Sequence, residues 1–516
     1  MILFDTIRKR ISRNFLQLPL QFLAIATLFI ATKVFFLLRY HLPIWDEAVY
    51  LGMGKYIYSL GHSGLWEMLR PVGLPLVIGW TWKIGLPYIF ASEIIAVLFG
   101  VGSILLCYLI GKKLFNGKVA VLAAALLATS PWFYLYSSYI LTEVPSVFFV
   151  LASIYFFTSK RHYLCGASVA LAMLFKFPNG LLLIALAAAS VASQLFKNLH
   201  FSLKIGSFFQ LTKVIASFIT ITLPFLVLNY LFYRPYTSNP FDAIFRPYIL
   251  ASWHQSNPAK AIASPLANYL FYLFQAINQH IVFIIAVAAV FLFFNRKWFK
   301  DSGKTLLAAY LVIYGLYFTY IPNKDERFLI LFLPAICVFA AAVFFEAVTY
   351  FRLRLSPPKA KFALTAVTLL LILSFSFALY KDLHFYTWRP ASEPAVVSEL
   401  YKSISKLGIN GAVLTSEPVF AAFNDNRFFP YYFTSYQGMP AELKALNEWE
   451  LNEPFEAVIF SQPTLFCPSG DSECQAARSN MYGFLQSHYK QVFNGAYYSS
   501  QISYFIFVNE SLHRNS

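Results

Sequence analysis

Apolar runs close to the length that crosses a lipid bilayer recur along most of the chain and dominate what it can fold into. A transmembrane helix needs about 20 mainly apolar residues. Runs of this kind lie at 15–38, 88–111, 119–136, 140–159, 162–175, 179–196, 208–231, 267–294, 305–320, 328–350 and 362–380. The sequence therefore predicts a mainly α-helical, polytopic bundle of about eleven membrane spans.

The composition supports a membrane protein. The 516 residues are 58% hydrophobic and only 12% charged, whereas soluble domains are about 25% charged. The formal net charge of +16 comes from short basic clusters between the apolar runs, as in the cytoplasmic loops of membrane proteins. Without a continuous basic patch or a nucleic-acid-binding motif, we expect no nucleic-acid partner.

The positions of Lys and Arg predict the orientation of the spans. The basic cluster at 8–13 places the N-terminus in the cytoplasm, and every second loop after it is basic. The first apolar run is too long for a cleaved signal peptide and stays as a span. The compact loops favour a prokaryotic plasma membrane. The outer face then receives 39–87, the turns near 137–142 and 176, the loop 232–266, the turn 321–327 and the C-terminal region.

The composition changes near residue 384, which divides the chain into a membrane domain, 1–383, and an outer domain, 384–516. Strand-like runs occur at 411–418, 455–463 and 503–510, and helical patterns at 392–408, 440–450 and 475–489. About 130 residues suffice for an independent core. We expect a soluble α/β domain, in which Cys467 and Cys474 could form a disulfide in an oxidising compartment.

Adjacent carboxylates follow the first span, in the stretch HLPIWDEAVY. Asp46 and Glu47 could serve as a general base or bind a metal, because partial desolvation raises a carboxylate pKa toward the working pH. They would equally suit a helix start, with Asp46 as the cap and Glu47 near the positive end of the helix dipole. Segments 48–61 and 75–86 then read as amphipathic helices that lie on the membrane surface and roof a cavity.

Another carboxylate, Glu143, lies at the predicted outer start of a span, in SSYILTEVPSVFF. Helix capping by Thr142 explains part of this pattern. A carboxylate at a membrane helix end is nevertheless costly unless it faces a polar cavity, which makes Glu143 a candidate for the same site.

Several cations are placed to meet a phosphate on the outer face. Arg70 precedes Pro71 at the start of the second surface helix, where guanidinium and backbone donors would coincide. Arg327 adjoins the next span in the turn KDERFL. Each could instead simply face water or lipid headgroups. The remaining candidates are the cations Lys176 and Lys324 and the acidic residues Asp325 and Glu326.

Taken together, WDEAVY, RPVGLPL, LTEVPSVFF and KDERFL resemble the GT-C superfamily of integral-membrane glycosyltransferases. Within it, residues 1–380 look most like the protein O-mannosyltransferase group that includes the lipid A aminoarabinose transferases. The chain departs from the latter in having Arg70 rather than lysine. Its KDERF turn is similar to the HKExRF motif of mannosyltransferases that build lipid-linked glycans, without the histidine.

The resemblance implies transfer of a sugar from a polyprenyl- or dolichyl-phosphate donor to a glycan, lipid or protein acceptor, with inversion, on the outer face of the membrane. It further implies Asp46 as general base, Glu47 as its acidic neighbour, Glu143 as the second acidic residue, and Arg70 at the carrier phosphate. No cofactor is implied with certainty; a divalent metal, if used, would involve Asp46 and Glu143.

A transporter or lipid flippase is the alternative function, since such proteins are also polytopic and aromatic-rich. A transporter should carry ionisable or helix-breaking residues deep in several spans and related halves. Here the polar candidates gather on one predicted face and the sequence has no repeat, which favours the enzyme.

Overall fold

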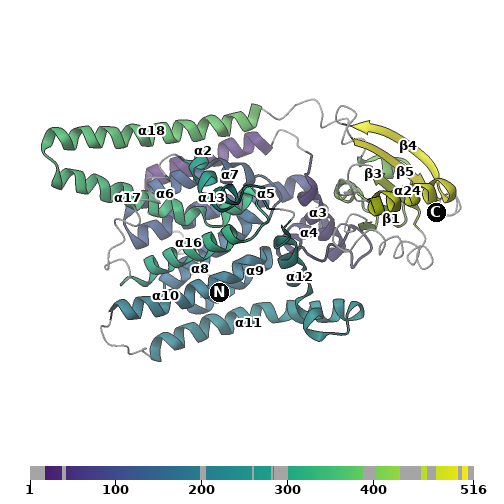
Figure 1. Ribbon diagram of the computed structural model, residues 1–516, viewed down its shortest axis with the longest axis horizontal. Helices are drawn as coiled ribbons and strands as arrows, with labels where there is room; N and C mark the ends of the chain where they lie inside the picture. The colour runs from purple at the N-terminus through teal and green to yellow at the C-terminus, as the bar shows by residue number, and fades with distance from the viewer. Residues whose placement is uncertain are drawn as a thin grey trace. The chain divides into compact units, whose positions relative to one another are not determined.

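The computed structural model describes residues 18–37, 42–197, 205–258, 261–280, 283, 300–387, 401–430, 455–461, 472–497 and 502–509 (Figure 1). The chain forms two compact units. The helical unit comes from residues 1–38 and 96–389, and the mixed unit from 39–95 and 390–516. The predicted fold class, a mainly helical bundle with a small C-terminal α/β part, is confirmed.

The helical unit follows the apolar runs of the sequence. Its helices are α2 Leu20–Leu37, α5 Tyr88–Leu114, α6 Gly117–Ala128, α7 Pro131–Tyr136, α8 Glu143–Thr158, α9 His162–Phe175, α10 Leu182–Lys197, α11 Ile205–Tyr233, α12 Pro240–Gln255, α13 Pro265–Gln279, α16 Ser302–Tyr320, α17 Leu333–Arg354 and α18 Pro357–Thr387. Helix α5 starts in the mixed unit. Short 3-10 helices occupy Phe177–Leu181 (η1), Arg234–Tyr236 (η2) and Glu326–Leu331 (η4).

Among the described helices, four are long and apolar enough to cross a membrane: Tyr88–Leu114, Phe209–Tyr233, Leu333–Arg354 and Pro357–His384. Two of the predicted apolar runs do not form single long helices within the described residues. The run 119–136 divides at Ser130, because Pro131 begins a new helix. Helix α13 ends at Gln279 within the run 267–294, and most of the run after His280 lies outside the described residues. The count of about eleven spans stays a prediction.

The core of the helical unit is formed mainly by small and aliphatic side chains. Helix α17 packs on α6, and α8 on α9, while η4 lies against α8. Helices α17 and α18 run side by side (Figure 1). The segment η4 is almost entirely buried from Phe328 to Leu331, which fixes the turn that carries the KDERFL motif.

The mixed unit combines two helices of the segment 39–87, α3 Trp45–Tyr58 and α4 Gly73–Lys83, with a five-stranded sheet. The strand order is β2-β1-β3-β5-β4, with β1 parallel to β2 and β3 and the β3–β5–β4 part antiparallel. The strands are β1 Val413–Thr415, β2 Phe428–Pro430, β3 Ala457–Ser461, β4 Lys490–Tyr497 and β5 Ile502–Val508. The remaining helices are α20 Ser403–Lys406, α21 Val419–Phe423 and α24 Ser472–His488.

The three predicted strands of the C-terminal region correspond to β1, β3 and β5, and the helical pattern at 475–489 falls in α24. Strands β2 and β4 were not predicted. The pattern at 440–450 lies outside the described residues, as does Cys467, so the Cys467–Cys474 disulfide stays a prediction. The structure groups 39–95 with the C-terminal residues, and the boundary at residue 384 likewise stays a prediction.

Helices α3 and α4 cross at two glycines. A Cβ added to Gly79 would lie 2.5 Å from the carbonyl oxygen of Gly54, and one added to Gly54 would lie 3.0 Å from the Cα of Gly79. Backbone atoms cannot yield as a side chain would. The close crossing therefore requires both glycines, and it fixes the helix that carries Asp46.

Replacing Gly79 with Ala is expected to destabilise the mixed unit by about 1–3 kcal/mol, because overpacking against backbone forces the two helices apart. Gly315→Ala in α16 is a matched control, since a Cβ there meets nothing within 4 Å. Thermal unfolding of the two purified variants tests the expectation. Equal midpoints would show that the crossing tolerates an added methyl group.

Candidate active site

The start of α3 separates the two adjacent carboxylates. Glu47 is fully buried, and its Oε2 accepts a hydrogen bond of 2.8 Å from the backbone N–H of Ile44, the N-cap residue. Glu47 therefore performs the helix-start function that the local sequence allowed. Asp46 lies in the first turn of α3 but does not occupy the cap position.

Asp46 instead contacts Arg70. The Arg70 Nη2 lies 2.7 Å from the Asp46 Oδ1, and the Arg70 Nε donates to the Glu67 Oε1 at 2.9 Å. The guanidinium also lies 5.7 Å from the ring centre of Tyr50. Arg70 thus joins two carboxylates, of which Glu67 is buried and Asp46 is partly exposed.

The electrostatics of Arg70 keep it charged. Burial by itself lowers its pKa, but Asp46 and Glu67 outweigh burial, and the pKa of Arg70 rises well above its ordinary value. Guanidinium groups bind carboxylates and phosphates through the same paired hydrogen bonds, and here the Arg70 guanidinium contacts two carboxylates.

The sequence analysis missed Glu67. Its only signal is the spacing E-x-x-R to Arg70, which is unremarkable in a loop. The sequence also placed Arg70 and Pro71 in the first turn of the second helix, whereas α4 begins at Gly73 with Val72 as its N-cap residue. Arg70 therefore lies before α4, and its side chain is held by carboxylates rather than by the helix start.

A second ion pair lies in the helical unit. The Lys176 Nζ, at the C-terminal end of α9, is 2.7 Å from the Oε1 of Glu143, the first residue of α8. Both side chains are largely buried, and the ammonium also lies 4.7 Å from the ring centre of Phe328 in η4. The second carboxylate oxygen, Oε2 of Glu143, is buried and has no hydrogen-bond partner within the described part of the chain.

Glu143 was expected to be explained partly by a Thr142 cap. Thr142 occupies the N-cap position, but its backbone is helical and its side chain makes no capping hydrogen bond. The capping interpretation is therefore wrong for Thr142. Glu143 is held by Lys176 instead, which the sequence identified only as a separate cation.

The KDERFL turn is organised by Asp325. Its carboxylate accepts hydrogen bonds from the backbone N–H of Arg327 at 2.9 Å and from the Arg327 Nε and Nη2 at 2.8 and 2.6 Å. Arg327 is also close enough to Glu143 to act on it electrostatically. The helical unit therefore gathers Glu143, Lys176, Asp325 and Arg327, while Glu326 begins η4.

Lys324 has a different role. Its Nζ donates to the backbone oxygens of Phe318, Thr319 and Ile321, at 2.7, 2.8 and 2.6 Å. These carbonyls terminate α16, so the ammonium caps that helix. Burial lowers the pKa of Lys324 to about 8. Because its three hydrogens are occupied, we assign Lys324 a structural role.

A metal site receives no support from local clustering. Within the described ranges, no three His, Cys, Asp or Glu side chains come close enough together to hold an ion. Asp46 and Glu143 belong to different units, so a metal shared by them stays a prediction, as does the cavity that the sequence expected them to share.

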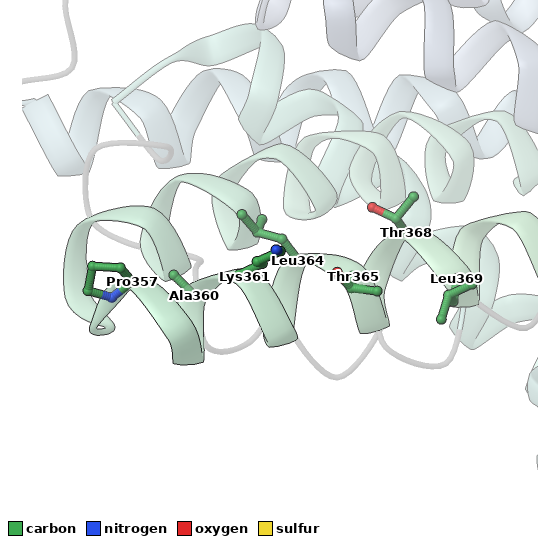
Figure 2. Close-up of a pocket in the computed structure, with 7 residues that line it drawn as sticks. All are labelled: Pro357, Ala360, Lys361, Leu364, Thr365, Thr368 and Leu369. Carbon is green, nitrogen blue, oxygen red and sulfur yellow. The ribbon is translucent and has the colours of Figure 1, made fainter.

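A hollow in the helical unit lies elsewhere. Its lining residues, from Pro357 to Leu369, all belong to α18 (Figure 2). They are mainly aliphatic, with Lys361 the single charge among them. A surface formed by one side of one apolar helix suits lipid contact rather than chemistry.

Comparison with known proteins gives these two clusters a context. Residues 70–227 match the family described as dolichyl-phosphate-mannose-protein mannosyltransferase. The fold is similar to that of ArnT from Cupriavidus metallidurans bound to undecaprenyl phosphate, with a TM-score of 0.62 and 12% identity over 94% of this chain and 98% of that chain. The chain has the GT-C fold. The resemblance predicted from the motifs is confirmed.

The archaeal oligosaccharyltransferase AglB from Archaeoglobus fulgidus, in complex with an inhibitory peptide and a dolichol-phosphate, is also similar. Its TM-score is 0.53 at 12% identity, over 95% of this chain and 74% of that chain. No curated protein matches the sequence. The family match begins at Arg70 and includes Glu143 and Lys176, whereas Asp46 precedes it.

Proposed function

We propose that this GT-C protein transfers a sugar from a polyprenyl-phosphate-linked donor to an acceptor on the outer face of the membrane, with inversion at the anomeric carbon. The observation that carries the proposal is the arrangement of Asp46, Arg70 and Glu67, a permanent cation that holds a partly exposed carboxylate. The GT-C fold and the family match over 70–227 support the same chemistry.

In the proposed reaction, an acceptor hydroxyl oxygen attacks the anomeric carbon while the bond from that carbon to the phosphate oxygen breaks. The polyprenyl phosphate leaves with the bonding electrons, and Asp46 takes the hydroxyl proton. Because the phosphate is already a stable leaving group, the enzyme mainly has to orient the substrates and stabilise charge.

Arg70 is proposed to bind the donor phosphate and to control the base. An adjacent guanidinium favours the ionised form of a carboxylate and so weakens it as a base. A phosphate that binds Arg70 would compete with Asp46 for the same guanidinium and would restore the basicity of Asp46. Donor binding would thereby activate the base.

Glu143, Lys176 and Arg327 are proposed as the second group of site residues. Glu143 would be the second acidic residue, and Lys176 and Arg327 would contact phosphate oxygens while they remain paired with Glu143 and Asp325. Glu47 would support Asp46 indirectly, by holding the first turn of α3.

Incubation of the purified protein with a panel of polyprenyl-phosphate sugars and candidate glycan, lipid and protein acceptors tests the proposed function. We expect turnover of at least one donor, with release of polyprenyl phosphate and a product of inverted anomeric configuration by NMR. Transport of labelled lipid or sugar across vesicles without any transfer product would instead favour the flippase function.

Replacing Arg70 with Ala is expected to raise the apparent KM for the donor by about 10- to 100-fold, which is the loss of one hydrogen-bonded charge contact. Arg70→Lys keeps the charge but not the paired geometry, and should fall between Ala and wild type. Donor titrations at saturating acceptor give these constants. An unchanged donor KM in folded Arg70→Ala would remove Arg70 from the phosphate site.

A further inference from the structure

A short C-terminal segment contacts both of the elements that carry the Asp46–Arg70 pair. The segment is residues 419–428, formed by α21, the following turn and the first residue of β2. It contacts α3, which carries Asp46, and the loop 59–72, which carries Glu67 and Arg70. All of these residues belong to the mixed unit.

The contact with α3 is made by a buried lysine. The Lys55 Nζ donates to the backbone oxygens of Ala422 at 3.1 Å and Asn424 at 2.9 Å, and it lies 3.0 Å from the Asp425 Oδ1. The Lys55 side chain is only 3% exposed, whereas that of Asp425 is 68% exposed. Asp425 also accepts a hydrogen bond of 3.1 Å from the Trp82 Nε1 in α4.

The contact with the loop is made by backbone. The Gly64 N–H donates to the oxygen of Asn426 at 2.8 Å, and the Phe428 N–H donates to the oxygen of Gly64 at 2.7 Å. Gly64 has a φ of +80°, which favours glycine. The loop is thereby attached to β2, the edge strand of the sheet.

We propose that segment 419–428 sets the position of α3 relative to the loop 59–72, and that Lys55 is a positioning residue for the Asp46–Arg70 pair. The C-terminal part of the chain would then be needed for the chemical step as well as for any acceptor recognition. This inference rests on the proposed function of Asp46 and Arg70.

The energetics favour such a role over simple tethering. A buried ammonium is costly unless its hydrogens are paired, and burial lowers the pKa of Lys55 despite the opposing effect of Asp425. An apolar side chain would join α21 to α3 without the free-energy cost of burying a charge. Hydrogen bonds from Lys55 to carbonyl oxygens at fixed positions allow fewer relative positions of α3 and α21 than apolar packing does. Lys55 lies nine residues after Asp46 on the same helix, roughly 14 Å along its axis.

Lys55→Met tests the inference in the full-length protein. Methionine keeps the length of the side chain and removes the charge and the donors. Lys83→Met is the matched control, since Lys83 is exposed at the end of α4. We expect amide exchange in 59–72 to accelerate by about tenfold or more, because the local structure opens more readily. We also expect kcat to fall by about tenfold or more, with a smaller change in the acceptor KM.

Asp425→Lys is the second variant, at a position where the side chain is 68% exposed and the replacement buries no new charge. It places a like charge beside Lys55, and the same changes should appear in weaker form. If Lys55→Met does not fold, Asp425→Lys decides the outcome. Unchanged exchange in 59–72 in a folded variant, or a kcat within twofold of Lys83→Met, would overturn the inference. If the wild-type protein transfers no sugar, the proposed function fails, and the exchange measurement alone still decides whether the segment positions the loop.

Discussion

Asp46→Asn is expected to lower kcat by about a hundredfold to ten-thousandfold, the range by which positioned general bases accelerate reactions. Asparagine keeps the size of the side chain and one hydrogen-bond acceptor for Arg70, but it cannot take a proton at neutral pH. The donor KM should change much less than kcat, because Arg70 remains available to the phosphate.

The measurement is single-turnover and steady-state transfer by purified Asp46→Asn, with the fold checked by thermal unfolding. Asp242→Asn is the matched control. Asp242 forms an ion pair of 2.8 Å with Arg246 in α12, close in geometry to the 2.7 Å pair of Asp46 with Arg70. Wild-type turnover by Asp46→Asn would exclude this carboxylate as the base, and an equal loss in both variants would indicate a general effect of breaking an ion pair.

Asp46 could be located from the sequence because two adjacent carboxylates shortly after an apolar run are rare, and both the run and its distance from the pair can be read directly from the sequence. It could not divide their roles. Only the helix start at Trp45 shows that Glu47 accepts a hydrogen bond from the backbone of Ile44 while Asp46 contacts Arg70. A helix that began one residue earlier would place Asp46 instead of Glu47 at the third helical position, and helix boundaries are the least certain part of any pattern.

Glu67 and Lys324 show two ways in which sequence patterns misjudge a single charged residue: one was missed, and the other was included in the site. Glu67 was missed because a single acidic residue in a loop normally faces water; its ion pair with Arg70 is local in sequence, but its burial is a property of the folded mixed unit. Lys324 was included because it lies in a charged outer turn. Its ammonium donates to the last carbonyl oxygens of α16. The same N–H donors cannot also bind a ligand, and composition does not reveal which of the two partners they meet.

The overall fold was more accessible to sequence reasoning than the site. Apolar runs determine helices because the bilayer leaves no other partner for backbone groups. The three strands with regular β-branched and aromatic patterns were predicted. Strand β2, in contrast, has only the three residues Phe428–Pro430, and its pairing with β1 and with Gly64 is decided by neighbours distant in sequence.

Lys176→Met is expected to destabilise the helical unit by about 3–5 kcal/mol and to abolish transfer, because it leaves the Glu143 carboxylate buried without its partner. One Glu143 oxygen already has no hydrogen-bond partner within the described residues, so the loss of the 2.7 Å contact at the other would leave the charge uncompensated. Lys118→Met, at an exposed lysine of α6, controls for the loss of a positive charge.

The double variant Glu143→Gln/Lys176→Met separates the structural role of the pair from its chemical role. Removing both charges relieves the unpaired carboxylate, so the unfolding midpoint should return toward that of the wild type. Transfer should remain lost, because the proposed second acidic residue is absent. Recovery of both stability and turnover in the double variant would show that Glu143 and Lys176 serve only to join α8 and α9. Recovery of stability alone would support a function for Glu143 that an amide cannot replace.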